Sequence, residues 1–388
     1  MTEAKTIERS TSYLQIQIYA LTAAAFAIGT TEFVIMGILP EIARDLSVTI
    51  PTAGLLVTGY ALGVVIAAPF VTLATRGVAR KPLLMGLMAL FILGNMIGAV
   101  APNYAILMTS RVVSAMCHAT YFGVGAVVAA SLVPPDRRAS AIALMFSGLA
   151  LANILGVPAG TFIGQLFGWR ATFIVVSLTG VIAFVATAIL IKPVETAQTE
   201  NIFDELAMLK RPRLWAALGT TVFGFGGLFA ILTFIAPILR DITGIAPQWV
   251  GAVLLVFGVG LTVGNVLGGR LADRNLELAT VGILLALALA NLGFYWIMFS
   301  AVATTVFMFV WGICAFATTA PLQTRVMLIS PDAPALASSL NIAAFNLGNA
   351  GGAYLGSEMI RQGYSYPSLA IAGAIVCACG IGLARLSR

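Results

Sequence analysis

Hydrophobic residues follow one another along this chain in long stretches that short polar segments separate. A helix needs about 20 apolar residues to cross the roughly 30 Å core of a bilayer. Helices are the expected form, because lipid offers no partner for free backbone N–H and C=O groups. The pattern predicts twelve helical spans, over about residues 13–38, 51–73, 82–100, 104–132, 139–166, 171–191, 214–238, 248–269, 277–299, 302–328, 334–358 and 366–385.

The composition excludes a soluble protein. Of 388 residues, 60% are hydrophobic and 9% are charged, whereas a soluble domain carries about 25% charged residues. A soluble enzyme, a disordered chain and a disulfide-rich secreted scaffold are therefore excluded. All four cysteines lie inside apolar stretches, where they indicate packing and not bridges or metal ligands: Cys117, Cys314, Cys377 and Cys379. We predict an all-α integral membrane protein.

The basic residues are distributed unevenly between the two sets of loops. With the N-terminus placed inside, sixteen of the 21 Lys and Arg fall on the inner side and four on the outer side. Cytoplasmic loops carry an excess of basic residues. We therefore predict a multi-pass protein of the inner (plasma) membrane with both termini in the cytoplasm. The net charge of +6 follows from this asymmetry, so no nucleic-acid partner is expected.

Two features recur along the chain at one offset of 196 residues. The segment PEIARDLSVTIP resembles PILRDITGIAP, and this offset aligns Arg44-Asp45 with Arg240-Asp241 and Pro51 with Pro247. A stripe of small residues in the fifth predicted span recurs in the eleventh: Gly148, Ala152, Gly156, Gly160 and Gly164, then Ala344, Gly348, Gly352 and Gly356. A duplicated six-span unit is predicted, with an N-terminal bundle at 1–191, a cytoplasmic linker at 192–213 and a C-terminal bundle at 214–388. Apolar residues at helical spacing predict a short amphipathic helix in the linker: Ile202, Phe203, Leu206 and Leu209.

The two stripes have two possible meanings. Small residues at every fourth position let another helix approach closely, which serves plain packing. They also suit helices that meet across the interface between the bundles and slide during gating, and Gly156, Pro158 and Gly160 are candidate gating residues on this interpretation. Pro158 inside the span predicts a local kink.

Three ionisable residues lie deep inside predicted spans: Glu32, Arg111 and His118. Such groups are costly in a membrane and indicate function. Glu32 shares a helical stripe with Tyr19 and Thr22, which predicts a face toward an aqueous cavity. Because desolvation disfavours a charged carboxylate, Glu32 is a candidate for binding protons or a polar substrate. The alternative is a structural residue paired with Arg111.

Arg111 and His118 are seven residues apart, so they share one helix face. Arg111 offers a fixed positive charge for tuning Glu32 or for binding substrate. His118 either shuttles protons or is a neutral, hydrogen-bonded packing residue. In the second bundle, Trp311, Asn346 and Asn349 are candidates for substrate contact, although amides also join membrane helices.

Several kinds of chemistry are absent from the sequence. There is no GxxxxGK[ST] motif for ATP, no cluster of metal ligands and no nucleophile–base constellation. We therefore expect neither an enzyme nor a bound cofactor or metal.

Local motifs are similar to those of the major facilitator superfamily. GGRLADRNLE (Gly268–Glu277) resembles its GxLaDRxGrk loop and keeps Asp273 and Arg274, whereas the first copy, LATRGVARK, has Thr75 in place of the acid and carries Arg76 and Arg80. The resemblance implies a gating role for the four charged residues of these loops. Arg111 resembles the basic residue of its RxxxG-type motif, and GVPAG (Gly156–Gly160) partly resembles its antiporter motif.

Longer segments resemble the arabinose-efflux and chloramphenicol-resistance branch of drug:proton antiporters: TTEFVIMGILPEIA, AMCHATYFG, VPPDRRASAIA and NILGVPAGTFIGQLFGWRATF. The resemblance implies a monomeric exporter that exchanges small molecules, such as drugs or sugars, for protons across the bilayer by alternating access. The alternatives are proton-linked uptake or uncoupled facilitation of a small polar solute, and a membrane receptor that transports nothing.

Overall fold

The computed structural model describes residues 2–75, 77–134, 138–192, 207–331 and 334–386, and this part of the chain is helical without strands. The first half contains α1 (Thr2–Gly37), α2 (Leu39–Asp45), α3 (Ile50–Ala74), α4 (Arg80–Ala99), α5 (Tyr104–Ser131), α6 (Arg138–Leu151), α7 (Val157–Phe167) and α8 (Trp169–Leu190). The second half contains α10 (Pro212–Leu232), α11 (Ile235–Pro237), α12 (Pro247–Arg274), α13 (Leu276–Ile297), α14 (Ala301–Ala317), α15 (Thr319–Ile329), α16 (Pro334–Arg361) and α17 (Tyr366–Leu386).

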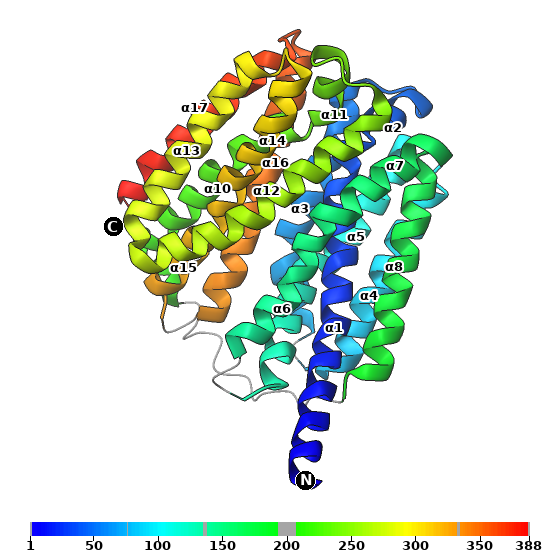
Figure 1. The fold of residues 1–388 in the computed structure, drawn as a ribbon, viewed down its shortest axis with the longest axis vertical. Helices are drawn as coiled ribbons and strands as arrows, with labels where there is room; N and C mark the ends of the chain where they lie inside the picture. The colour runs from blue at the N-terminus through cyan, green and yellow to red at the C-terminus, as the bar shows by residue number, and fades with distance from the viewer. Residues whose placement is uncertain (1, 76, 135–137, 193–206, 332–333, 387–388) are drawn as a thin grey trace.

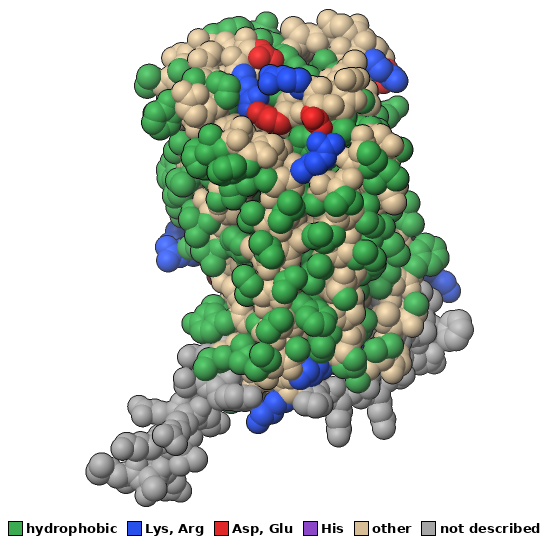
Figure 2. All heavy atoms as spheres, turned by 90° about the vertical axis from the view of Figure 1, so that its right-hand side faces the viewer, with side chains coloured by type: hydrophobic (Ala, Val, Ile, Leu, Met, Phe, Trp, Pro, Cys, Tyr) green, Lys and Arg blue, Asp and Glu red, His purple; other side chains and the backbone are tan. Residues whose placement is uncertain are grey.

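Eleven segments of the described chain are long and apolar enough to cross a membrane. The one predicted span outside this set is the eleventh, α16, which has 28 residues but carries several polar side chains: Ser338, Ser339, Asn341, Asn346 and Asn349. On the face shown in Figure 2, charged side chains gather toward the two ends, and hydrophobic and uncharged side chains cover the middle. The predicted helical membrane fold is confirmed.

The fifth predicted span is interrupted where its proline lies. A π-helical turn over Ala152–Gly156 joins α6 to α7, and the Val157 N–H donates to the Ala152 carbonyl, five residues back. Pro158 follows immediately and has no N–H to donate. The predicted irregularity is therefore present as a π-turn, a frequent form of local distortion in helices.

The hydrophobic cores show how the two halves meet. We call the end with α2 and α11 the upper end and the end with the N-terminus the lower end (Figure 1). One continuous core joins both halves, including Phe33, Ile38 and Leu39 of the first with Phe229 and Leu254 of the second. Two other cores stay within one half each: one lies around Leu21, Leu84 and Tyr121, and the other around Leu214, Val326 and Ala337. The halves are thus packed together toward the upper end.

The stripes of small residues face inward within each half, and the roles of Gly156, Pro158 and Gly160 in gating stay predictions. A Cβ on Gly156 would overlap Thr30 of α1, and one on Gly160 would overlap Val34 of the same helix. In the second half, a Cβ on Gly348 would come within 2.5 Å of the Val222 carbonyl of α10. Both stripes therefore let the first helix of each half approach closely, and they do not form the interface between halves.

Other glycines form the contacts between the halves. A Cβ on Gly258 of α12 would overlap the Asn153 carbonyl, and one on Gly251 would lie 3.1 Å from the Pro158 carbonyl. Gly54 of α3 packs against Phe234 of the second half. The predicted amphipathic helix of the linker depends on residues 202–206, which lie outside the described residues, so it stays a prediction.

Candidate functional site

Glu32 of α1 and Arg111 of α5 lie side by side, but the Glu32 carboxylate and the Arg111 guanidinium form no ion pair. Arg111 is fully buried, and its terminal nitrogens donate to the backbone carbonyls of Thr31 at 2.7 Å and Glu32 at 3.4 Å. Its Nε has no hydrogen-bond partner among the described atoms. Arg111 thus holds the backbone of α1 and leaves the Glu32 carboxylate available for other partners.

His118 and Tyr60 complete the cluster around Glu32. His118 lies beside the carboxylate, with its Nδ1 4.0 Å from Glu32 Oε2, and it carries a charge only when it is protonated. The same Nδ1 lies 3.1 Å from the hydroxyl of Tyr60 on α3. The Arg111 guanidinium carbon sits 4.2 Å from the centroid of the Tyr60 ring. The structure therefore brings together all three ionisable residues that the sequence predicts, and adds Tyr60.

Each half contains a buried, hydrogen-bonded asparagine, and the two are related by the offset of the repeat. Asn95 accepts a hydrogen bond from the Thr31 hydroxyl, next to Glu32. Asn291, which is 196 residues later, accepts one from Trp311 Nε1 at 2.8 Å and donates to Cys377 Sγ. The offset of 196 residues thus relates these two buried asparagines as well as the loops and the stripes of small residues.

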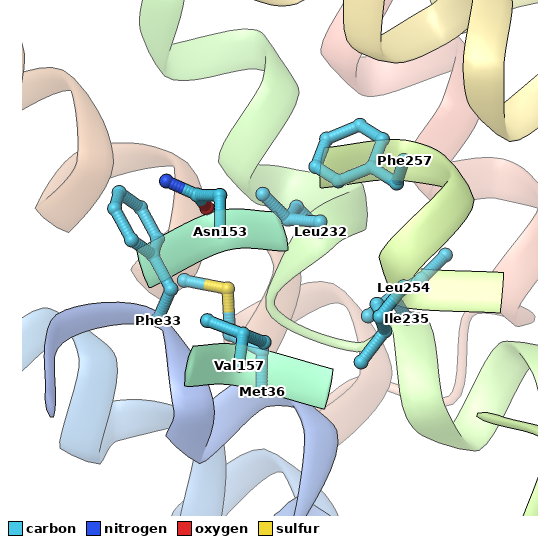
Figure 3. Close-up of a pocket in the computed structure, with 8 residues that line it drawn as sticks. All are labelled: Phe33, Met36, Asn153, Val157, Leu232, Ile235, Leu254 and Phe257. Atoms are coloured by element: carbon cyan, nitrogen blue, oxygen red, sulfur yellow. The ribbon is translucent and has the colours of Figure 1, made fainter. Parts of the chain in front are cut away.

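A small apolar pocket lies between the halves, within the core that joins them (Figure 3). Its one polar lining side chain is Asn153, and the others are apolar: Phe33, Met36, Val157, Leu232, Ile235, Leu254 and Phe257. Trp311 is buried behind this pocket, stacked on Phe294 and in contact with Phe257. Its predicted contact with substrate stays a prediction.

The other candidates for substrate contact differ in exposure. Tyr19 on the lower part of α1 is 54% exposed. Its stripe neighbour Thr22 is buried and donates to the Leu144 carbonyl. Asn346 and Asn349 are buried on α16, and the amide oxygen of each lacks a hydrogen-bond partner among the described atoms. These two oxygens can accept hydrogen bonds from a solute.

Charged residues cluster at the upper end. Arg240 of the second half donates to Glu41 of the first at 2.5 Å, and both side chains are largely buried. Within the first half, Asp45 accepts hydrogen bonds from Arg170 at 2.5 Å and from Trp169 Nε1 at 3.0 Å. The hydrogen bond from Arg170, followed by the one from Trp169, holds the pKa of Asp45 below its ordinary value.

The motif residues at the lower end are only partly described. Asp273 and Arg274 are exposed at the end of α12, and Arg80 begins α4. Arg76 lies outside the described residues, so its gating role stays a prediction.

A helical membrane protein whose two halves meet over a small pocket, with a carboxylate buried beside that junction, has the architecture of a solute transporter. The model of the Major Facilitator Superfamily matches residues 21–353, and the chain belongs to this superfamily. The family resemblance read from the sequence motifs is confirmed.

Relatives and a solved structure agree with this assignment. The inner membrane transport protein YdhP of Escherichia coli K12 is 45% identical over 95% of this chain and 95% of its own. The chloramphenicol resistance protein of Streptomyces lividans is 36% identical over 87% and 88% of the two chains. The crystal structure of a bacterial homolog of the human lysosomal transporter Spinster, inward-facing and unoccupied, has a TM-score of 0.77 at 16% identity and covers 97% of both chains.

Proposed function

We propose that this transporter is a proton-coupled exporter of small molecules in the inner membrane, with its lower end in the cytoplasm. The observation that carries the proposal is the Glu32 carboxylate, which is 8% exposed and lies 4.0 Å from His118, a group that is charged only when protonated. A buried carboxylate with no permanent ion pair exchanges a proton when its surroundings change, because burial penalises the charged form. The excess of Lys and Arg at the lower end supports the orientation.

The cycle follows from alternating access. With the upper end open, Glu32 takes up a proton from outside and the solute leaves. With the upper end closed, as in this structure, burial keeps Glu32 protonated until a solute that enters from the cytoplasm displaces the proton, which then leaves toward the cytoplasm. The groups available to the solute are the apolar pocket, the exposed Tyr19 and the two acceptor oxygens of α16. Arg111 and His118 supply the charge and the relay beside Glu32.

The names of relatives support export and suggest the first solutes to test. Besides the chloramphenicol resistance protein, a probable sugar efflux transporter of Helicobacter pylori is 31% identical over 89% of this chain. A growth-inhibition screen of an overexpressing strain against antibiotics, dyes, nucleosides and sugars would identify the solute. Chloramphenicol is the first probe.

The test uses Glu32→Gln in proteoliposomes with an imposed pH gradient. We expect the variant to fold normally but to lose gradient-driven movement of the solute by more than about tenfold, because an amide of the same shape binds no proton at this position. The control is Glu358→Gln, which removes a partly exposed carboxylate that pairs with Arg361 on its own helix. Undiminished gradient-driven efflux in Glu32→Gln would refute the proton site. Movement of the solute in the same direction as the protons would refute export.

A further inference from the structure

Tyr60 contacts two members of the buried charge cluster at once. It is 1% exposed on α3, with its hydroxyl 3.1 Å from His118 Nδ1 and its ring under the Arg111 guanidinium. Both partners lie on α5, more than 50 residues away in the sequence. Tyr60 is therefore placed by packing between α3 and α5, and any shift of α3 along α5 alters both contacts.

The same helix touches the other half. The Thr58 hydroxyl of α3 donates to the Ala350 carbonyl of α16 at 3.4 Å. One turn above, a Cβ on Gly54 would come within 2.7 Å of the Phe234 ring and 2.9 Å of the Ser357 hydroxyl. Helices α3 and α16 are thus closely packed, and Thr58, which contacts α16, is two residues from Tyr60.

The hydrogen bond between Tyr60 and His118 depends on the protonation of one nitrogen. Nδ1 of His118 is the atom that faces both the Tyr60 hydroxyl and Glu32 Oε2. When Nδ1 has no proton, it accepts a hydrogen bond from the hydroxyl. When Nδ1 carries a proton, it is a donor, and the hydroxyl must turn to accept. A change of proton at this nitrogen therefore changes the bond that Tyr60 makes.

We propose that Tyr60 is a positioning residue that transmits the protonation state of the Glu32–His118 pair to the contact between α3 and α16. The inference rests on the proposed function and deepens it by naming the residue through which the proton acts on the interface. The titratable groups around Tyr60 are Glu32 of α1 with Arg111, Cys117 and His118 of α5. The facing part of α16, residues 344–352, contains no ionisable side chain.

The experiment measures the opening of the upper end without any solute. Spin labels are attached to Arg44→Cys and Gln248→Cys, two exposed positions on different halves, after Cys314 and Cys379 are replaced by Ser. Distances between the labels are measured in nanodiscs across a pH series. In the protein with native Tyr60 we expect acid to increase the closed population, because the closed structure buries Glu32 and favours its neutral form.

Tyr60→Phe keeps the ring under Arg111 and removes the hydroxyl. We expect the midpoint of the pH response to move by about 0.4 to 1 pH unit, the change that one hydrogen bond produces, while the open and closed distances stay the same. The matched control is Tyr104→Phe. Its hydroxyl donates to the Thr52 carbonyl at 2.7 Å and so joins the same two helices away from the charge cluster. In this control the midpoint of the pH response should equal that of the protein with both tyrosines intact.

A midpoint in Tyr60→Phe equal to that of Tyr104→Phe would overturn the proposal, as would a response that is independent of pH when Tyr60 is intact. If Tyr60→Phe does not fold, His118→Gln provides the second variant and should alter the midpoint as well. Glu32→Gln separates the two hypotheses. If it keeps the full pH response while Tyr60→Phe shifts it, the proposed proton site is wrong, but Tyr60 still transmits protonation of His118.

Discussion

At the scale of single residues, the sequence identifies the charged members of the site but not their uncharged partners. Glu32, Arg111 and His118 stand out because ionisable residues are rare inside membrane spans. Tyr60 and Asn95 do not stand out, because hydroxyls and amides occur in many apolar helices. Their roles depend on contacts between residues 58 and 64 positions apart. Only the packing of α3 on α5 and of α1 on α4 makes those contacts visible.

Trp311 provides a prediction at this scale. Replacing it by Phe keeps the stacked ring but leaves the amide oxygen of the buried Asn291 without its donor. An unpaired buried acceptor costs about 1–3 kcal/mol, so the thermal midpoint of the purified protein should fall. The control is Trp296→Phe, since Trp296 is 65% exposed. Equal midpoints for the two variants would mean that the hydrogen bond contributes nothing.

At the scale of helices, the pattern of small residues identifies close packing but not the packing partner. Small residues at every fourth position in the fifth and eleventh spans predict that another helix approaches closely, and the structure has one such helix in each case. The sequence cannot distinguish a partner in the same half from one across the interface, because small residues serve both. The partners are α1 and α10, so these stripes stabilise each half.

Two glycines of α16 provide a matched test. Gly348→Ala places a Cβ 2.5 Å from the Val222 carbonyl, whereas a Cβ on Gly351 meets nothing within 4 Å. Overpacking typically costs about 1–3 kcal/mol, and Gly→Ala at an open helical position is neutral or stabilises by up to about 1 kcal/mol. Thermal unfolding in detergent should therefore rank Gly348→Ala below Gly351→Ala. The opposite order would contradict the packing of α16 on α10.

At the scale of the whole molecule, the twelve-span arrangement in two halves follows from the hydrophobic pattern and the repeat, and the family match confirms it. The state of the transporter does not follow from the sequence, because the same chain has to form both states. In the structure, a core shared between the halves and the Glu41–Arg240 pair close the upper end.

Arg240→Gln tests that closure. The substitution leaves the largely buried Glu41 without its charged partner, and a hydrogen bond to a charged group contributes about 1.5–3 kcal/mol. We expect the equilibrium to shift toward the open upper end, seen as longer distances between labels at positions 44 and 248. Arg361→Gln is the control, because Arg361 pairs with Glu358 on its own helix and is exposed. An unchanged distance distribution in Arg240→Gln would show that apolar packing alone closes this end.

The polar content of α16 has a consequence for how the protein is made. This helix is too polar to count among the eleven apolar spans, and amides and hydroxyls oppose its insertion as an isolated segment. Its Asn341 bonds to Thr221 of α10 and to Gln323 of α15, two helices that leave the ribosome earlier. We therefore predict that, as the second half is made, α10 and α15 stay at or next to the translocon until α16 enters the bilayer against them.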